Sequence, residues 1–412
     1  MRLTRYGCEN YKAFRDPATV ELRPLTIFLG QNNSGKSALL RLPLLLLRAL
    51  SRDAPRDGFP LEARGLSFGR VFRDLIHGGH AHGHAKFGLE ATSDGERLDL
   101  EASVQNVVEA PGRGASTSEV SVVSRIDIRS PVPRALQWNP TRGELRSYEG
   151  IGRVRFRGLL PEGLEDWLFL DSWRDSVPEF DAQVSHLGPL RAPSLPTYEV
   201  GPRRPMGSTG ADAVGWLAVD DDLRRAVSEW LEENLGGWRL ELDFAGSAFR
   251  CLLVRGGVSV NLCDAGQGVQ QVLPVVVQQL ARQQEGHMTQ FLDLVEQPEL
   301  HLHAAGEAPL GDLLLETARL RAGVVLVETH SENLLLRVRR RIAEGSDPEL
   351  VALYWIDDSP EGHSTVRRIH IDERGEVDFW PAGLFSEAYA EVKALRRAAR
   401  PASTPHEGCL RC

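Results

Sequence analysis

Apolar positions near the N-terminus alternate and then run together in a way that predicts strands followed by a helix. A strand pair is expected within residues 1–25, and the apolar, β-branched run 25–29 leads directly into Gly30. Segment 37–50 is rich in leucine and predicts a helix, which Pro43 should bend rather than end because leucines continue on both sides. The chain is therefore expected to pass from a strand, through a glycine loop, into a helix.

The middle of the chain changes to short runs of alternating apolar and polar residues. Between residues 87 and 157 these runs are separated by Gly, Pro, Asp and Ser, which predicts a β-rich insertion. A helix is expected over 164–177, stopped by Pro178, and a connector bounded by Pro and Gly follows at His186–Pro193. Segment 221–235 predicts an amphipathic helix whose apolar face packs into a core. Further short strands come after it.

The C-terminal part alternates helices and strands. Starting with a helix, the alternating segments are 269–284, 290–295, 306–321, 324–328, 332–344 and 351–355. Alternation of this kind predicts a mostly parallel sheet with crossover helices. A small β-hairpin and a helix are expected after it. The sequence contains no heptad run and no internal repeat, so long coiled-coil arms are not expected.

Composition indicates a soluble globular protein. The chain has 412 residues, of which 42% are hydrophobic and 25% charged. Its apolar run at 39–50 is interrupted by Arg41, Pro43 and Arg48, and the N-terminus lacks the apolar region of a signal peptide. The five cysteines are scattered and odd in number, which argues against a disulfide framework. We therefore expect a cytoplasmic protein that does not enter a membrane.

The formal net charge of −9 excludes a surface that is positive all over, but it leaves room for a local basic groove. One basic cluster consists of Arg337, Arg339, Arg340 and Arg341. It is either a solvated helix face, which is the favoured interpretation, or a phosphate contact.

The strongest single motif is a phosphate-binding loop between the expected strand and helix. It fits G-x-x-x-x-G-K-[ST] at every fixed position. In such a loop backbone N–H groups surround phosphate oxygens, Lys36 reaches the β and γ oxygens, and Ser37 can ligate Mg²⁺. The expected nucleotide-binding residues here are Gly30, Gln31, Asn32, Asn33, Ser34, Gly35, Lys36, Ser37 and Ala38.

Two further residues follow strands of the predicted parallel sheet. The strand 291–295 delivers Glu296 at its carboxyl end, where ligands of α/β sheets bind, so Glu296 is the candidate acidic partner of Mg²⁺. His330 comes two residues after the next strand, and we expect it at the same sheet edge, in reach of the γ-phosphate.

A second anion-binding feature precedes a helix. Asp264, Gly266 and Gly268 place glycine-exposed amides at a helix N-terminus. Because the loop at residues 30–37 already holds one nucleotide's phosphates, this turn makes sense as a cap on the nucleotide of another subunit. Two chains would then enclose two ATP molecules head to tail.

Taken together, these motifs resemble the SMC/RecF/OLD-type branch of ABC ATPases, which includes bacterial ATPases of DNA repair and anti-phage systems. The resemblance is carried by residues 10–14, 26–40, 187–193, 264–274, 295–303 and 327–335. It implies an α/β fold: an ABC-ATPase head, that is, a P-loop NTPase with a mostly parallel sheet and an antiparallel β subdomain. A β-rich insertion is expected in that head, and no long coiled coil. By this resemblance Lys36 and Ser37 bind phosphate and Mg²⁺, residues 264–268 form the signature loop, Glu296 is the Walker B acid and His330 is the switch histidine.

The chain departs from the family pattern in two ways. Gln297 stands where a carboxylate normally activates water, and an amide does not accept a proton at neutral pH. Hydrolysis is therefore expected to be slow, with Glu299 or His330 as substitute bases. In addition, residues 331–412 are too few for the nuclease domain that OLD proteins append to the head.

These expectations divide the chain into four parts and suggest a function. The parts are the N-terminal half of the head (1–86), the β-rich insertion (87–185), the C-terminal half of the head (186–345), and a hairpin, helix and frayed tail (346–412). We expect an ATPase that dimerises on ATP, with Mg²⁺ as cofactor, and that regulates a separately encoded nuclease or toxin, or binds nucleic acid, in anti-phage defence or DNA repair. The alternative is a non-catalytic scaffold that uses ATP to hold a toxic effector inactive. A transporter ATPase subunit is less favoured, because the glycine turn at 264–268 departs from the transporter signature.

Overall fold

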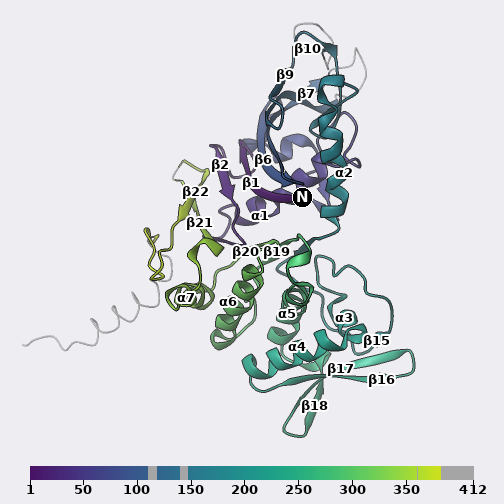
Figure 1. The fold of residues 1–412 in the computed structure, drawn as a ribbon, viewed down its shortest axis with the longest axis vertical. Coiled ribbons are helices and arrows are strands. Elements are labelled where there is room, and N and C mark those ends of the chain that lie inside the picture. The colour runs from purple at the N-terminus through teal and green to yellow at the C-terminus, as the bar shows by residue number, and fades with distance from the viewer. Residues whose placement is uncertain (110–117, 140–146, 360, 382–412) are drawn as a thin grey trace, which may run out of the picture.

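The central layer of the protein is a six-stranded sheet. The computed structural model describes residues 1–109, 118–139, 147–359 and 361–381. The strand order is β14-β19-β20-β3-β21-β22, and all neighbours are parallel except the β21–β22 pair. The strands are β3 (Leu25–Gly30), β14 (Val184–Leu187), β19 (Leu292–Glu296), β20 (Val324–Glu328), β21 (Val351–Asp358) and β22 (Ser364–Ile369). The predicted mostly parallel sheet is thus confirmed (Figure 1).

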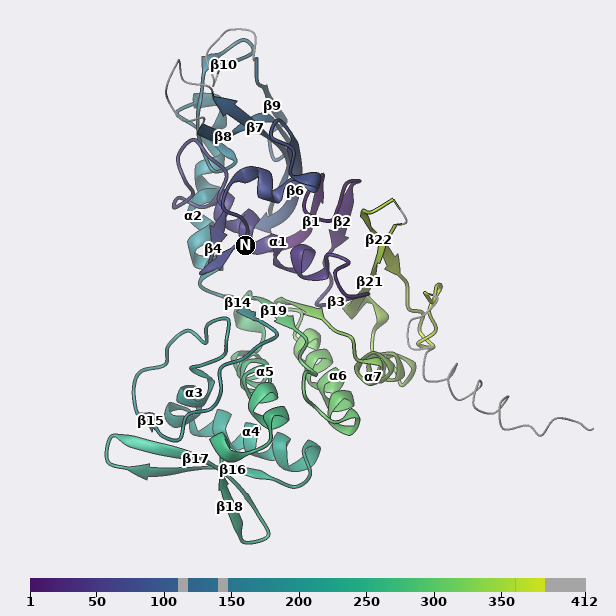
Figure 2. The same ribbon diagram turned by 180° about the vertical axis from the view of Figure 1, so that it is seen from behind.

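Helices cover both faces of this sheet. On one face lie α1 (Lys36–Leu50) and α2 (Phe169–Asp181), and on the other lie α5 (Gln267–Glu285), α6 (Ala304–Arg319) and α7 (Glu332–Ala343) (Figures 1 and 2). Two apolar cores result. Phe28 packs in the first core, whereas Leu25, Ile27 and Leu29 pack in the second, because successive side chains of a strand point to opposite faces. Strand β3 is therefore shared by both cores.

Helix α1 continues through Pro43, as the sequence predicts. Proline has no N–H, so the carbonyl of Leu39, four residues earlier, loses its helical donor. The hydroxyl of Tyr6 replaces it and donates to the Leu39 oxygen at 3.0 Å within the core. The proline is thus accommodated by a residue of the first strand.

Helix α2 differs from its prediction at both ends. It starts later than residue 164 and continues past Pro178, where the sequence predicted its end. Val177 and Phe180 are buried on either side of the proline. Packing of these two side chains stabilises the helix beyond the proline, and this tertiary effect cannot be seen in the local sequence pattern.

The second six-stranded sheet is antiparallel and lies beside α1 and α2 (Figure 2). Its order is β2-β1-β6-β7-β8-β9, with bounds β1 (Arg2–Glu9), β2 (Ala18–Glu21), β6 (His84–Ser93), β7 (Glu96–Glu109), β8 (Ser118–Ser130) and β9 (Arg134–Gln137). The strands expected as a separate insertion therefore extend a sheet that β1 and β2 begin. The division between residues 86 and 87 falls inside β6, because β1 pairs with β2 on one edge and with β6 on the other.

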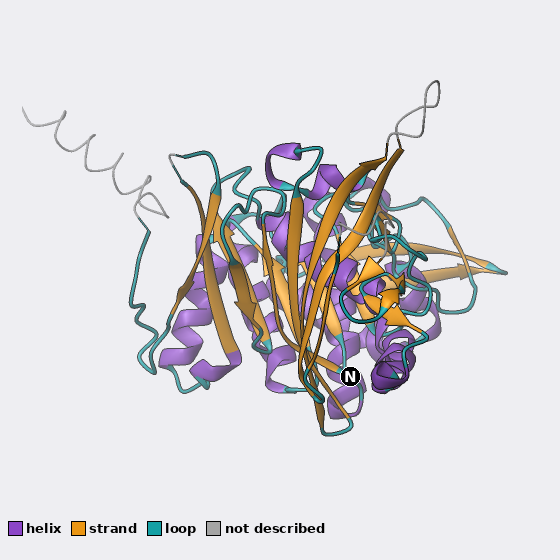
Figure 3. Ribbon diagram, turned by 90° about the horizontal axis from the view of Figure 1, so that it is seen from above, coloured by secondary structure: helices purple, strands orange, loops and turns teal. Residues whose placement is uncertain are grey.

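A smaller sheet and two helices lie beside α5. The sheet contains β15 (Tyr198–Glu199), β16 (Arg239–Ala245), β17 (Ala248–Arg255) and β18 (Val258–Asn261), and the helices are α3 (Ala213–Val219) and α4 (Asp221–Asn234). Helix α4 is the predicted amphipathic helix, and the carboxylate of Asp220 caps it by accepting from the amide of Leu223 at 2.9 Å. The β16–β17 hairpin projects away from the helices (Figures 1 and 3). Short strand pairs complete the described elements: β4 (Glu62–Ala63) with β5 (Leu66–Ser67), β10 (Ser147–Tyr148) with β11 (Gly152–Arg153), and β12 (Arg155–Arg157) with β13 (Leu160–Glu162).

The C-terminal elements complete the central sheet. Strand β22 pairs with β21, so the hairpin extends that sheet at its edge. The helix and tail expected after residue 380 lie outside the described residues. Among the described helices the longest is α5, with 19 residues, so the expected absence of a long coiled coil holds for this part of the chain. None of the described helices combines the length and apolar character needed to cross a bilayer.

Candidate nucleotide site

The glycine loop joins β3 to α1 at one end of the central sheet. Gly30 is fixed by packing, since a Cβ atom there would lie 2.2 Å from the carbonyl oxygen of Ile356 on β21. Gly35 sits at the N-cap of α1 with φ of 88°, a left-handed conformation that favours glycine. Asn33 also has a positive φ, of 65°. The motif glycines are therefore required by the backbone, independently of any ligand.

Lys36 lies folded over this loop. Its Nζ donates to the carbonyl oxygens of Gly30 at 3.1 Å and Gln31 at 2.5 Å. Burial lowers the pKa of Lys36, with the charges of Glu328 and Asp358 opposing the effect. An ammonium held by neutral carbonyls gains a stronger partner when a phosphate oxygen arrives, because charge-assisted hydrogen bonds exceed neutral ones.

The carboxylate of Glu296 is buried at the end of β19 and held by two cationic partners. Arg41 of α1 donates to both oxygens, from Nε to Oε1 at 2.7 Å and from Nη2 to Oε2 at 2.6 Å. Nε2 of His186, on β14, lies 2.5 Å from Oε1. Burial alone would raise the pKa of Glu296, but the hydrogen bonds from His186 and Arg41 and the charge of Arg41 outweigh it and lower that pKa. Glu296 is therefore a fixed anion.

A second carboxylate lies one strand closer to the loop. Glu328 ends β20, stands in register with Glu296, and accepts a hydrogen bond from Ser37 Oγ at 2.6 Å. Burial raises the pKa of Glu328, the hydrogen bond from Ser37 opposes this, and the charge of Glu296 adds to it. Sequence reasoning did not assign a role to Glu328.

Arg41 and His186 were also missed. Arg41 lies four residues after Ser37, which puts both on one face of α1, and this spacing was a usable signal. His186 offered no local signal, because the parallel pairing of β14 with β19 brings it to Glu296.

The loops after β19 and β20 are tied to each other. The N–H of Gln297, whose φ is 45°, donates to the backbone oxygen of Glu328 at 2.7 Å. Glu299 Oε1 accepts from the amide of His330 at 2.7 Å, and burial raises the pKa of this carboxyl despite that hydrogen bond. The side chain of His330 is exposed. The candidate residues Glu296, Gln297, Glu299 and His330 thus share one end of the sheet with the glycine loop.

Arg191 connects this cluster to helix α5. Its guanidinium donates to the backbone oxygens of Glu296 at 2.8 Å and Gln297 at 3.4 Å. Burial lowers the pKa of Arg191 to about 10, while the carboxylates of Glu299 and Glu296 act in the opposite direction. The backbone of Arg191 forms two hydrogen bonds with the side-chain amide of Gln271 on α5: its N–H donates to Oε1, and its carbonyl oxygen accepts from Nε2. The connector predicted at His186–Pro193 is therefore a structural bridge.

The glycine turn at residues 264–268 lies at the start of α5 and is open to solvent. Gly266 is the N-cap of that helix and is exposed, and a Cβ atom there would meet nothing within 4 Å. Gly268 is packed instead, since its Cβ would lie 2.6 Å from the carbonyl oxygen of His301. Among the described residues no hydrogen bond joins this turn to the glycine loop of the same chain. Asp264 is exposed as well.

The basic cluster of α7 is neutralised by its neighbours. Arg337 and Arg341 both donate to the carboxylate of Asp312 on α6, and Arg340 donates to Glu344 at 2.7 Å. Arg339 donates to the backbone oxygen of residue 375 at 2.7 Å. These contacts favour the helix-face interpretation over a phosphate contact.

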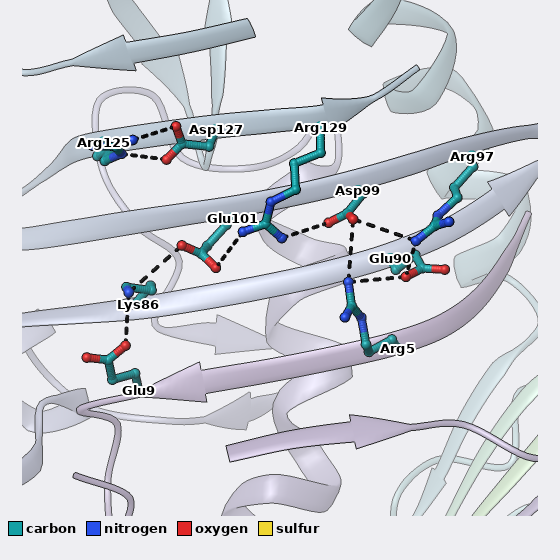
Figure 4. Close-up of polar contacts among 10 residues, drawn as sticks. All are labelled: Arg5, Glu9, Lys86, Glu90, Arg97, Asp99, Glu101, Arg125, Asp127 and Arg129. Carbon is teal, nitrogen blue, oxygen red and sulfur yellow. Dashed lines mark hydrogen bonds and ion pairs between the residues drawn. The ribbon is translucent and has the colours of Figure 1, made fainter. Parts of the chain in front are cut away.

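A second charged surface lies on the antiparallel sheet. Figure 4 shows acids and bases that pair with each other, most of them between neighbouring strands: Arg5, Glu9, Lys86, Glu90, Arg97, Asp99, Glu101, Arg125, Asp127 and Arg129. A hollow of about 920 Å³ is lined in part by this network. Its mixed charge differs from the uniformly basic surface typical of binding to a nucleic-acid backbone.

The residues at the glycine loop fit a nucleotide with Mg²⁺. Ser34 Oγ is buried without a hydrogen-bond partner, which leaves a polar atom of the loop available for a ligand. The hydroxyl of Ser37 and the carboxylates of Glu296 and Glu328 are the oxygen donors that Mg²⁺ prefers beside substrate phosphates. Lys36 and the start of α1 add positive charge where phosphates would lie.

Two family models match parts of the chain. An AAA domain family, whose description names the AbiEii toxin and type IV TA systems, matches residues 25–337. A family of unknown function, DUF3696, matches residues 347–395. No curated protein matches the chain.

Solved structures similar to the chain include SMC head domains. One from Thermotoga maritima is 11% identical, with a TM-score of 0.44, and the match covers 90% of this chain and 100% of that one. A second, bound to the C-terminal winged-helix domain of ScpA, is 13% identical, with a TM-score of 0.49 and coverage of 90% and 99%. A third, with an extended coiled coil and bound to the C-terminal domain of ScpA from Pyrococcus furiosus, is 12% identical, with a TM-score of 0.43 and coverage of 97% and 100%. Because the family match spans most of the chain, including the glycine loop and both carboxylates, the chain belongs to this AAA domain family.

Proposed function

We propose that the protein binds ATP with Mg²⁺ in the loop Gly30–Ser37 and that two copies close around two ATP molecules. In this dimer each copy supplies the loop for one nucleotide and the exposed turn at Gly266 for the other. The observation that carries the proposal is the separation of the two anion-binding features. The loop is backed by carboxylates at one sheet end, whereas the turn at Gly266 is open to solvent and not bonded to it.

The side chains of one copy have distinct tasks in this proposal. Lys36 exchanges its two carbonyl partners for β and γ phosphate oxygens and so neutralises charge. Ser37 lies on the expected Mg²⁺ side of the site, next to the carboxylates that end β19 and β20, and a bound Mg²⁺ would offset charge that develops on the phosphates. His330 lies exposed on the loop after β20, from which it can donate to the γ-phosphate.

Hydrolysis is slow in this proposal because Gln297 cannot act as a base. Its backbone N–H donates to the backbone oxygen of Glu328, which fixes the backbone of Gln297 just after the end of β19. Glu299 and His330 remain the candidate bases. Glu299 already uses one oxygen to accept from the His330 amide, which supports a positioning task for that carboxylate.

The cellular role follows from long-lived ATP-bound dimers. We propose that the dimer regulates a separately encoded effector, such as a nuclease or toxin, or binds nucleic acid, in anti-phage defence or DNA repair. The link of the family to a toxin–antitoxin system supports this direction. Gln297 also favours a second candidate, a scaffold that holds ATP without turnover and keeps an effector inactive. Phosphate release measured with and without DNA separates the two, since only the ATPase would show turnover.

The dimer is tested with two substitutions that separate nucleotide binding from association. Lys36→Ala should lower ATP affinity in calorimetry by about 10- to 150-fold, the value of a hydrogen bond between charged groups at about 1.5–3 kcal/mol. Gly266→Asp should leave ATP affinity unchanged but abolish the ATP-dependent dimer in light scattering, because it places a negative charge where the partner's γ-phosphate would lie. The fold should tolerate it, since Gly266 has φ of −58° and open space around it.

Gly201→Asp is the matched control. A Cβ atom at Gly201 also meets nothing within 4 Å, and the residue follows Val200, which bonds to the β16–β17 turn. This variant should dimerise like the wild type. A wild-type chain that stays monomeric at saturating ATP, or a Gly266→Asp chain that still dimerises, would count against the proposal.

A further inference from the structure

The metal side of the site contains one carboxylate more than its sequence motifs assign. Glu328 is the last residue of β20, and β20 lies between β3, which carries the glycine loop, and β19, which carries Glu296. A side chain at the end of β20 is therefore one strand nearer to the loop than a side chain at the end of β19.

The contacts of Glu296 leave it little capacity for a metal ion. Both of its oxygens accept from Arg41, and Oε1 also faces His186 Nε2. Its side chain is 2% exposed. To ligate an ion directly, it would have to give up an ion pair that is largely enclosed, and such pairs are costly to break.

Glu328 has the opposite set of contacts. Its Oε2 accepts from the hydroxyl of Ser37, the residue that the loop motif assigns to Mg²⁺. Among the described residues no hydrogen bond to Oε1 is formed, and the residue as a whole is buried, at 4% exposed. Ser37 and Glu328 thus offer a hydroxyl and a carboxylate that already lie 2.6 Å apart. Two adjacent oxygen donors facing the phosphates are the usual protein contribution to an Mg²⁺ site.

Resting on the proposed ATP site, we propose that Glu328 is the carboxylate that faces Mg²⁺ beside Ser37, and that Glu296 acts behind it as a positioning residue. With Mg²⁺ bound, the Ser37 hydroxyl would offer its oxygen to the ion, and the Glu328 carboxylate would supply the neighbouring negative charge. Glu296 holds Arg41 and His186 in place, and its own charge lies behind Glu328 as seen from the Mg²⁺ ion.

Divalent-ion binding tests this assignment independently of turnover. Mn²⁺ is used as the probe because it takes the same oxygen ligands as Mg²⁺ and is detected by electron paramagnetic resonance. The full chain is titrated with Mn²⁺ in the presence of a non-hydrolysable ATP analogue. Glu328→Gln, which keeps the size of the side chain, should weaken Mn²⁺ binding by about tenfold or more, the loss expected when a second-layer or direct ligand is removed. The same variant should bind the analogue in EDTA at least as well as the wild type.

Three further variants sharpen the result. Glu332→Gln removes a like charge at the start of α7, four residues later, and should bind Mn²⁺ as the wild type does. Glu296→Gln should weaken Mn²⁺ binding less than Glu328→Gln does. Glu328→Asp keeps the charge on a shorter stem and should give an intermediate loss, and it carries the test if the glutamine variant does not fold.

Each outcome decides a specific claim. Wild-type Mn²⁺ affinity in folded Glu328→Gln or Glu328→Asp overturns the assignment, as does a loss in Glu296→Gln that exceeds the loss in Glu328→Gln. Equal losses in Glu332→Gln and Glu328→Gln mean that only general charge is sensed, and this also overturns it. A wild-type chain that binds no analogue at all refutes the proposed ATP site itself, which is a different result.

Discussion

The pair formed by Arg41 and Glu296 gives a quantitative test of how the site is held together. Replacing Arg41 with alanine removes both hydrogen bonds to the carboxylate, at 2.7 and 2.6 Å, and leaves His186 as its remaining cationic partner. The Glu296 side chain is 2% exposed and that of Arg41 is 32% exposed. Breaking a fully buried pair costs about 3–5 kcal/mol. Because Arg41 is partly solvated and His186 stays, we expect a loss below that range, of about 2–3 kcal/mol, for Arg41→Ala.

This loss should depend on pH in a defined direction. In the wild type the contacts from His186 and Arg41 overcome burial and lower the pKa of Glu296. Its charge therefore contributes stability above the unfolded-state pKa of about 4.3, and this contribution is lost as the pH falls through the lower folded-state value. Without Arg41 the folded-state pKa rises, so the variant takes up a proton at higher pH. The stability difference between the two proteins should then shrink as the pH falls from about 7.5 to about 3.5, through the unfolded-state pKa.

Urea unfolding at a series of pH values measures both quantities. Arg48→Ala is the control, because Arg48 lies on the same helix and pairs at 3.8 Å with Asp53, whose side chain is 81% exposed. An exposed pair of this kind is worth about 0–1 kcal/mol. Equal losses for Arg41→Ala and Arg48→Ala, or a loss for Arg41→Ala that is the same at about pH 7.5 and about pH 3.5, would refute the reasoning.

Three other substitutions test separate features. Gly30→Ala puts a Cβ atom 2.2 Å from the Ile356 carbonyl oxygen, so we expect more than about 3 kcal/mol of lost stability in urea, and an unchanged midpoint would contradict the loop packing. Asp293→Ala removes a carboxylate that the guanidinium of Arg282 bonds at 3.0 Å in the core and leaves Glu285 as its remaining acidic partner, so it should cost about 2–3 kcal/mol by the same assay; a loss below about 1 kcal/mol would show that the pair is dispensable. Gln297→Glu restores a carboxylate and should raise phosphate release by about 10²-fold or more, whereas a fast wild-type rate would remove the idea of slow turnover.

The sequence was most informative where the determinants are local. The glycine loop is a contiguous stretch between a strand and a helix. Glycine is required at Gly30 by a close backbone contact and at Gly35 by a left-handed backbone conformation. The position of Glu296 at the end of a buried strand could also be predicted, because a short apolar run that ends in an acid is visible along the chain.

Features that depend on pairing between distant strands could not be predicted in the same way. His186 reaches Glu296 because β14 and β19 are neighbours. The division at residue 86 misses the sheet formed by β1 and β6, since alternation predicts strands but not their partners. Glu328 is visible at the end of its strand, yet its contact with Ser37 depends on β20 lying beside β3.

Strand β3 has a mechanical consequence for the molecule. Its alternate side chains pack into two different apolar cores, on opposite faces of the central sheet. If the half of the molecule around one core loosens, the other core loses packing partners on β3. The two halves should therefore melt together rather than in succession, and neither should survive alone as a fragment. Since the glycine loop starts at the end of this shared strand, loosening either half would also disturb the backbone amides of the loop.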